Sequence, residues 1–103
     1  MLKHCVLLSL RSQDETASVE DAMRLLDGLV GKVDGMIDFS CGANRDFENK
    51  SEEYQYGFVV TFTDREAHLA YERHPDHVKA GGMLVAACRG GHEGIFVADI
   101  ETN

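Results

Sequence analysis

The 103-residue sequence predicts an α+β domain with a ferredoxin-like layout, in which helices cover one face of an antiparallel sheet. Three observations predict this fold class. Four short apolar segments have strand character, and amphipathic segments separate them in the order β-α-β-β-α-α-β. No linker or low-complexity run divides the chain, so we expect a single domain over residues 1–103.

The first strand is predicted at residues 3–10. Its run is apolar on both faces, with Cys5 and Leu7 on one side and His4, Val6, Leu8 and Leu10 on the other. We therefore expect both faces to be buried. The apolar run is short and lacks a small-residue cleavage site, which favours a strand over a signal peptide.

A helix is predicted next, with Ser18 as its N-cap and Asp21 in the position that a capping box gives to an acid. Its apolar residues recur at intervals of three and four, which indicates one buried stripe: Val19, Ala22, Met23, Leu26, Leu29, Val30 and Val33. We expect this helix to end at Gly31 or Gly35.

The second and third strands are predicted at residues 36–44 and 54–63, with a charged solvent loop at 45–53 between them. The third strand has the clearest alternation, with Tyr54, Tyr56, Phe58, Val60 and Phe62 on one face. Asp64 is the predicted cap of a helix over residues 65–71. A further helix begins at Pro75 and ends at Gly90, although Gly81 and Gly82 weaken its middle. Residues 94–100 form the last predicted strand.

The two faces of the predicted sheet have unequal cover. Helices cover one face, yet the first and third strands carry apolar side chains on both. A chain of this length has a small core, so pairing with a second copy would bury more apolar surface. We expect a homodimer that packs sheet against sheet.

Composition excludes several partners. The formal net charge is -8, from 18 acidic and 10 basic residues, and no basic cluster interrupts it, so we expect no nucleic-acid partner. No segment is long enough to span a membrane, and no membrane partner is expected. Cys5, Cys41 and Cys88 are odd in number and widely spaced, which is typical of reduced thiols in a cytoplasmic protein.

Residues 71–77 hold the main candidate for chemistry, because a phenol and two imidazoles surround the chain's only proline there. Proline disfavours helical geometry in the preceding residue, so His74 should end one helix and Pro75 should begin the next. Imidazole titrates near neutral pH, and His77 with Tyr71 could act as acid and base. Alternatively, Pro75 only joins two helices, and the histidines cap or hydrate the junction.

A metal centre is an alternative at the same place. His74 and His77 are three residues apart, and His4 could approach them in the fold. The spacing of dedicated zinc motifs is missing, and the proline separates the directions of the two imidazoles. The sequence therefore predicts no dedicated metal site.

Four segments of the chain, residues 3–8, 57–67, 71–77 and 96–99, resemble the stress-responsive α/β-barrel, or Dabb, family within the dimeric α+β barrel superfamily. The similarity covers nearly the whole chain, and the order of the motifs makes it specific. One branch of this family, which includes the plant olivetolic acid cyclase, performs a cofactor-free aldol cyclisation of a polyketide.

This resemblance implies that His77 is a general base, that Tyr71 supports it, and that His4 lines the substrate pocket. It also implies a small apolar or carbonyl ligand and no cofactor. Gly81 and Gly82 replace bulkier residues of the cyclase, which puts the same acyl-binding pocket in question. Two other functions stay open: a non-enzymatic, stress-associated dimer that holds an apolar ligand, and a cofactor-independent or haem-handling monooxygenase, although tryptophan is absent. His4 could also be a core histidine with no role in chemistry.

Overall fold

A computed structural model describes all residues, 1–103. Its elements are β1 (Leu2–Leu8), the 3₁₀ turn η1 (Gln13–Glu15), α1 (Thr16–Asp27), β2 (Met36–Ala43), β3 (Tyr56–Phe62), α2 (Arg65–Arg73), α3 (Pro75–Ala87), the 3₁₀ turn η2 (Gly91–Gly94) and β4 (Ile95–Glu101). The predicted order of strands and helices is confirmed. No helix of the chain is both long enough and apolar enough to cross a membrane.

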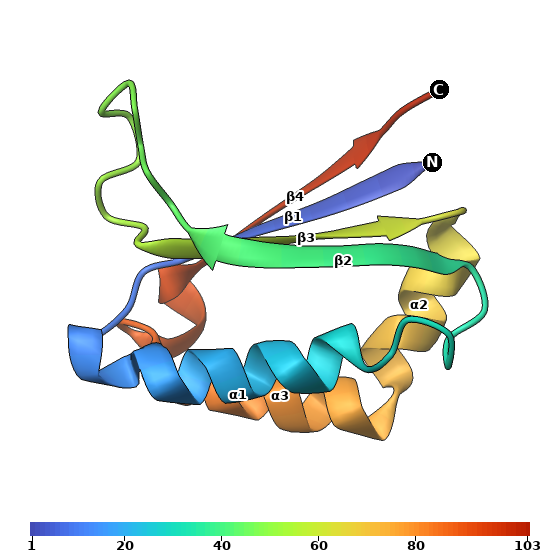
Figure 1. The fold of residues 1–103 in the computed structure, drawn as a ribbon, viewed down its shortest axis with the longest axis horizontal. Helices are drawn as coiled ribbons and strands as arrows, with labels where there is room; N and C mark the ends of the chain where they lie inside the picture. Colours follow the sequence, from blue (N-terminus) through green and yellow to red (C-terminus); the bar gives the residue numbers. More distant parts are fainter.

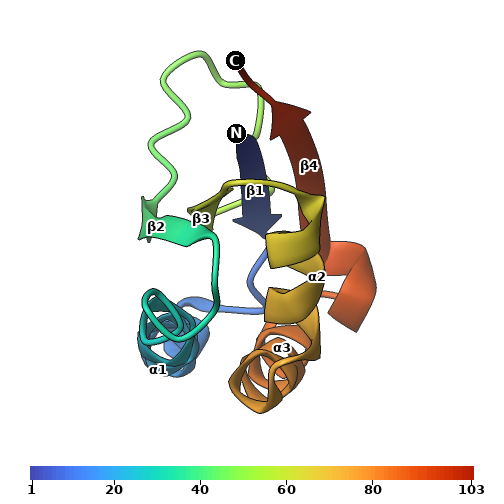
Figure 2. The same ribbon diagram turned by 90° about the vertical axis from the view of Figure 1, so that its right-hand side faces the viewer.

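The four strands form one sheet in the order β2-β3-β1-β4, and every neighbouring pair is antiparallel. Figure 1 shows all helices on one side of this sheet, and Figure 2 shows α1 below β2 and α3 nearer β1 and β4. This is the ferredoxin-like arrangement that the sequence predicts. The chain begins at β1 and ends after the neighbouring edge strand β4, so both chain ends lie at the same end of the sheet (Figure 1).

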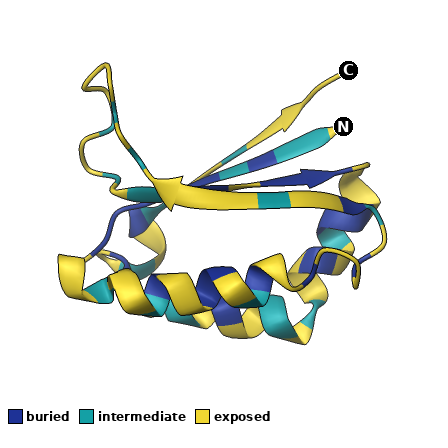
Figure 3. Cartoon of the chain, in the orientation of Figure 1, coloured by how far each residue is buried: buried dark blue, intermediate teal, exposed yellow.

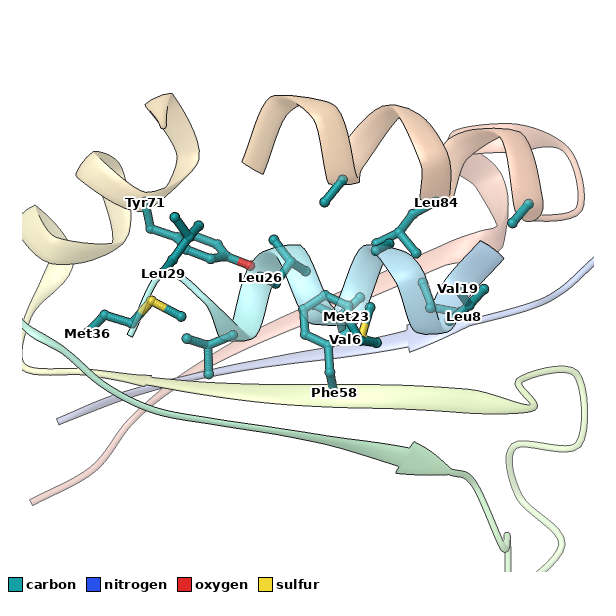
Figure 4. Close-up of a cluster of buried hydrophobic side chains, with 14 of the residues drawn as sticks. Val6, Leu8, Val19, Met23, Leu26, Leu29, Met36, Phe58, Tyr71 and Leu84 are labelled. Carbon is teal, nitrogen blue, oxygen red and sulfur yellow. The ribbon is translucent and has the colours of Figure 1, made fainter. Parts of the chain in front are cut away.

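The core fills the space between the sheet and the helices (Figure 4). Alternate residues of β1 and β3 point into it, because side chains in a strand alternate between the two faces. The helices supply residues spaced three or four apart. The fully buried members include Leu8, Val60, Phe62, Val19, Leu26 and Tyr71.

The opposite face of the sheet has no layer over it (Figure 3). Cys5 stands directly between Val59 of β3 and Ala98 of β4, so these three side chains share the uncovered face. Cys5 is only half-buried and Val59 is exposed, as is Phe96 on the same face. The expectation that β1 is buried on both faces is therefore wrong for a single chain, because the helices shield one face only.

Helix α1 departs from its predicted ends. It begins at Thr16, and its N-cap is Glu15 instead of Ser18. The capping hydroxyl belongs to Ser12, which accepts from the Asp14 backbone N–H at 3.2 Å and starts the short turn η1. The helix ends at Asp27, before either predicted glycine, since a tighter turn follows in which the Leu29 N–H donates to the Leu26 carbonyl.

The long loop between β2 and β3 is confirmed, and its own polar side chains order it. Asp46 Oδ1 accepts from the backbone N–H groups of Lys50 and Ser51 and from the Ser51 hydroxyl, and these bonds, led by Lys50, lower the pKa of Asp46. The loop carries Phe47, which is 91% exposed. Strand β3 begins at Tyr56, two residues after its predicted start.

Candidate functional site

The α2–α3 junction has the geometry that proline dictates. His74 is extended, with φ −65° and ψ 137°, and it ends α2, while Pro75 takes the first position of α3. The Nδ1 of His74 accepts a hydrogen bond from the Asp76 backbone N–H at 3.1 Å. This nitrogen is therefore occupied by helix capping, which gives His74 a structural role.

The junction stands beside a cavity of about 660 Å³ between α3 and the β1–β4 side of the sheet. Aliphatic side chains and two glycines of α3 form much of its wall, and imidazoles and carboxylates form the rest. The lining residues are His4, Val6, Phe58, Glu72, His77, Val78, Gly81, Gly82, Leu84, Val85, His92, Ile95, Val97 and Asp99. The cavity combines an apolar wall with a few polar groups, as small-molecule sites do.

His77 reaches this cavity from the first turn of α3. Its ring packs edge-on against Tyr71, with 4.5 Å between the ring centroids. Burial lowers the pKa of His77, and the carboxylate of Glu72 acts more weakly in the opposite direction. His77 is therefore a neutral imidazole at pH 7, which is the form that can accept a proton.

His4 enters the cavity wall from β1 and is paired with Asp99 of β4. The two residues are directly opposite in the antiparallel register, so both side chains leave the sheet on the helix side. His4 Nδ1 lies 2.6 Å from Asp99 Oδ1, a short hydrogen bond that fixes the imidazole ring. Sequence reasoning missed Asp99, whose importance depends on the strand register.

Tyr71, which the resemblance gives as the support of His77, lies on α2. Its side chain is fully buried in the core and is absent from the cavity lining (Figure 4). The hydroxyl has no hydrogen-bond partner, and burial raises the pKa of Tyr71 strongly. Its ring contacts those of Phe62 and His77 with centroid distances of 5.1 and 4.5 Å, so Tyr71 supports His77 from behind.

His68 is the second residue that sequence reasoning missed. It lies on α2 with 9% exposure, and its ring centroid is 4.8 Å from that of His4. Its Nε2 is 3.0 Å from Glu72 Oε1, but the angle does not suit a hydrogen bond and the atom has no other partner. Burial, followed by His4, lowers the pKa of His68. The three-residue spacing from His68 to Tyr71 places both on one helix face, and this signal could have identified it.

The site residues named from sequence therefore separate into two groups. His4 and His77 line one cavity although they are 73 positions apart in the chain, whereas Tyr71 lies behind the wall. His74 Nδ1 caps α3, so this nitrogen is not free to share a ligand with His77. Clustered imidazole and carboxylate atoms instead come from His4, His68 and Asp99.

Known proteins match both the sequence and the fold. The model of the stress-responsive A/B barrel domain family, Dabb, matches residues 2–102. The stress-response A/B barrel domain-containing protein HS1 of Arabidopsis thaliana is 30% identical over 86 residues, covering 84% of this chain and 79% of that protein.

Two solved structures extend the comparison. A dimeric ferredoxin-like protein of unknown function from Jannaschia sp. CCS1 has 50% identity and a TM-score of 0.94, with 98% of each chain covered. The hydroxynitrile lyase of Passiflora edulis has a TM-score of 0.78 over 99% of this chain and 93% of its own, and its 16% identity shows a shared fold alone. The match of the family model over nearly the whole length shows that this chain belongs to the stress-responsive A/B barrel (Dabb) family.

Proposed function

We propose that the chain is a cofactor-free enzyme that removes a proton next to a carbonyl group in a small, partly apolar substrate. The observation that carries this proposal is the shared cavity of His4 and His77, in which a neutral imidazole faces an apolar space of about 660 Å³. A volume of this kind is in the range of ordinary small-molecule pockets.

His77 is the base in this proposal. A carbon acid between two carbonyls transfers its proton to the neutral imidazole, and the resulting enolate can attack a second carbonyl or collapse with loss of a leaving group. The imidazolium that forms lies near the carboxylate of Glu72, which already raises the pKa of His77 against the effect of burial. Glu72 therefore favours the protonated form that the reaction creates.

His4 is the substrate-positioning group. Its hydrogen bond to Asp99 holds the ring in one orientation, which lowers the entropic cost of ordering a bound carbonyl compound. Tyr71 keeps the His77 ring in place by edge-on packing. The Tyr71 hydroxyl does not contact the substrate in this mechanism, because that oxygen is buried in the core.

A second candidate function is ligand binding without turnover. The wall at Gly81 favours it, since a Cβ built there would meet no atom within 4 Å and the space beside α3 is open to an apolar tail. Gly81→Leu should fill this space and weaken the binding of apolar ligands. Ala86→Leu is the matched control, because Ala86 lies on the exposed side of the same helix.

A screen of β-keto acyl compounds and small reactive carbonyls separates the two functions. Turnover should fall by roughly a hundredfold to ten-thousandfold in His77→Ala. His92→Ala is the control, because His92 lines the same cavity with no assigned role. Undiminished turnover in His77→Ala contradicts the mechanism, and turnover that requires dioxygen would point to a monooxygenase. Binding that Gly81→Leu abolishes, with no turnover of any compound, would establish the binding protein.

A further inference from the structure

Three side chains from distant parts of the chain converge next to the cavity: His4 of β1, His68 of α2 and Asp99 of β4. Each offers one ligating atom, and these atoms all lie within 4.8 Å of one another. Two imidazoles and a carboxylate form a donor set that suits zinc, and imidazole selects such borderline ions over magnesium or calcium.

The state of His68 gives an independent reason to expect a ligand. Its Nε2 is buried and makes no hydrogen bond, although the carboxylate oxygen Oε1 of Glu72 lies 3.0 Å away. Polar atoms at such depth are nearly always paired with protein, water or an ion. A metal ion beside His4 and Asp99 would supply the missing partner, and the nearby carboxylate of Glu72 would add negative charge outside the ligand set.

We propose that His4, His68 and Asp99 bind one zinc ion per chain. Neighbouring ligand atoms in a tetrahedral zinc site are separated by about 3.3 Å, given bonds of about 2.0–2.1 Å. The three atoms already lie within 4.8 Å of one another, and binding would require His4 and Asp99 to move apart from their 2.6 Å hydrogen bond. Three protein ligands leave a fourth position free, and His4 and Asp99 place the site at the cavity wall.

Zinc would replace the hydrogen bond between His4 and Asp99, so a bound ion would change the positioning role of His4. The proton transfer proposed for His77 needs no zinc, because His77 is outside the ligand set. The sequence predicts no dedicated metal site, because His74 and His77, with His4 near them, lack the spacing of a zinc motif. The three ligands do not form a sequence motif, because His68 is 64 positions after His4 and Asp99 is 31 positions after His68. Only the register of β1 with β4 and the packing of α2 bring them together.

The test measures zinc binding to the full-length protein after chelator treatment. A Cys41→Ser background is used under reducing conditions, because Cys41 is the exposed thiol. Titration calorimetry with Zn²⁺ should show one binding site per chain. The same titration with Mg²⁺ should show no binding. His68→Ala and Asp99→Asn should each weaken binding about tenfold or more, and Co²⁺ should give the intense visible absorption of a tetrahedral site.

His77→Ala is the matched control, since it should lose turnover and keep zinc binding. Asp99 is partly exposed, so Asp99→Asn keeps the test valid if His68→Ala fails to fold. If both Asp99→Asn and His68→Ala bind zinc as strongly as the unsubstituted protein does, the proposal is overturned and the binding is that of an adventitious ion only. Absence of zinc binding to the unsubstituted protein overturns it as well, without bearing on the role of His77.

Discussion

The hydroxyl of Tyr71, like the Nε2 atom of His68, is buried without a hydrogen-bond partner. Burying such a group is unfavourable, so Tyr71→Phe should raise the free energy of unfolding by about 1 kcal/mol. Chemical denaturation of both proteins measures this difference. Tyr54→Phe is the control, because Tyr54 is only half-buried, and it should leave stability unchanged. A loss of stability in Tyr71→Phe would show that the hydroxyl is hydrogen-bonded in solution.

Stability should depend on pH through the buried histidines. Burial lowers the pKa of His77 and His68 in the folded state, whereas the unfolded chain has the ordinary histidine value near 6.5. Below that value the unfolded state binds more protons, so the free energy of unfolding decreases as pH falls from 7 towards 5. His77→Gln should flatten this dependence in denaturation experiments at pH 7 and pH 5.5. If the free energy of unfolding of His77→Gln decreases with falling pH as much as that of the unsubstituted protein, His77 does not cause the pH dependence.

How much of the site can be read from the sequence depends on how local each residue's signal is. His74 and His77 belong to one short motif, and the place of His74 at the helix junction follows from the proline that comes after it. The role of His77 is implied by the family resemblance and not by a local rule. Asp99 has no local signal, because its meaning comes from its strand partner His4. Tyr71 packs against His77, but the motif does not reveal that its hydroxyl is buried in the core.

At the scale of elements, the α2–α3 junction should be sensitive to the capping side chain. His74→Ala removes the acceptor of the Asp76 N–H bond and should lower the free energy of unfolding by about 1 kcal/mol. Asn is a good N-cap, so His74→Asn should retain most of the stability. Thermal and chemical denaturation compare the two. Equal losses in both variants would mean that His74 contributes through packing and not through capping.

Sequence patterns predict some of the helices and strands better than others. Alternation predicts β3 well, because Phe58, Val60 and Phe62 all face the core. Helix α3 continues through Gly81 and Gly82, since packing of Ala80 and Leu84 on the core outweighs the low propensity of the two glycines. The start of α1 is predicted wrongly because Ser12, Thr16 and Ser18 all carry a hydroxyl that could cap a helix. In the structure Ser12 caps the turn that precedes α1.

At the scale of the whole molecule, the uncovered sheet face predicts assembly. Val59, Phe96 and Ile100 are exposed on that face, and a second copy packed sheet against sheet would bury them. The related Jannaschia protein is described as dimeric. We expect a homodimer at micromolar concentration by sedimentation velocity, with a melting temperature that rises with protein concentration.

Charge on the uncovered face should dissociate this dimer. Val59→Lys should yield monomers that are also less stable, because the same apolar surface serves assembly and folding. Val30→Lys is the matched control, since Val30 is an equally exposed valine beyond the end of α1. A monomeric unsubstituted protein at micromolar concentration would contradict the account of the sheet face.

The proposed function requires that the cavity residue His77 removes a proton from a carbon acid. Exchange of the hydrogen between the two carbonyls of a β-keto thioester in D₂O measures this step without the natural substrate. The account predicts that the protein accelerates this exchange, that His77→Ala reduces the acceleration roughly a hundredfold or more, and that His92→Ala preserves it. Exchange at the background rate in the unsubstituted protein, or equal acceleration in His77→Ala, would contradict the claim.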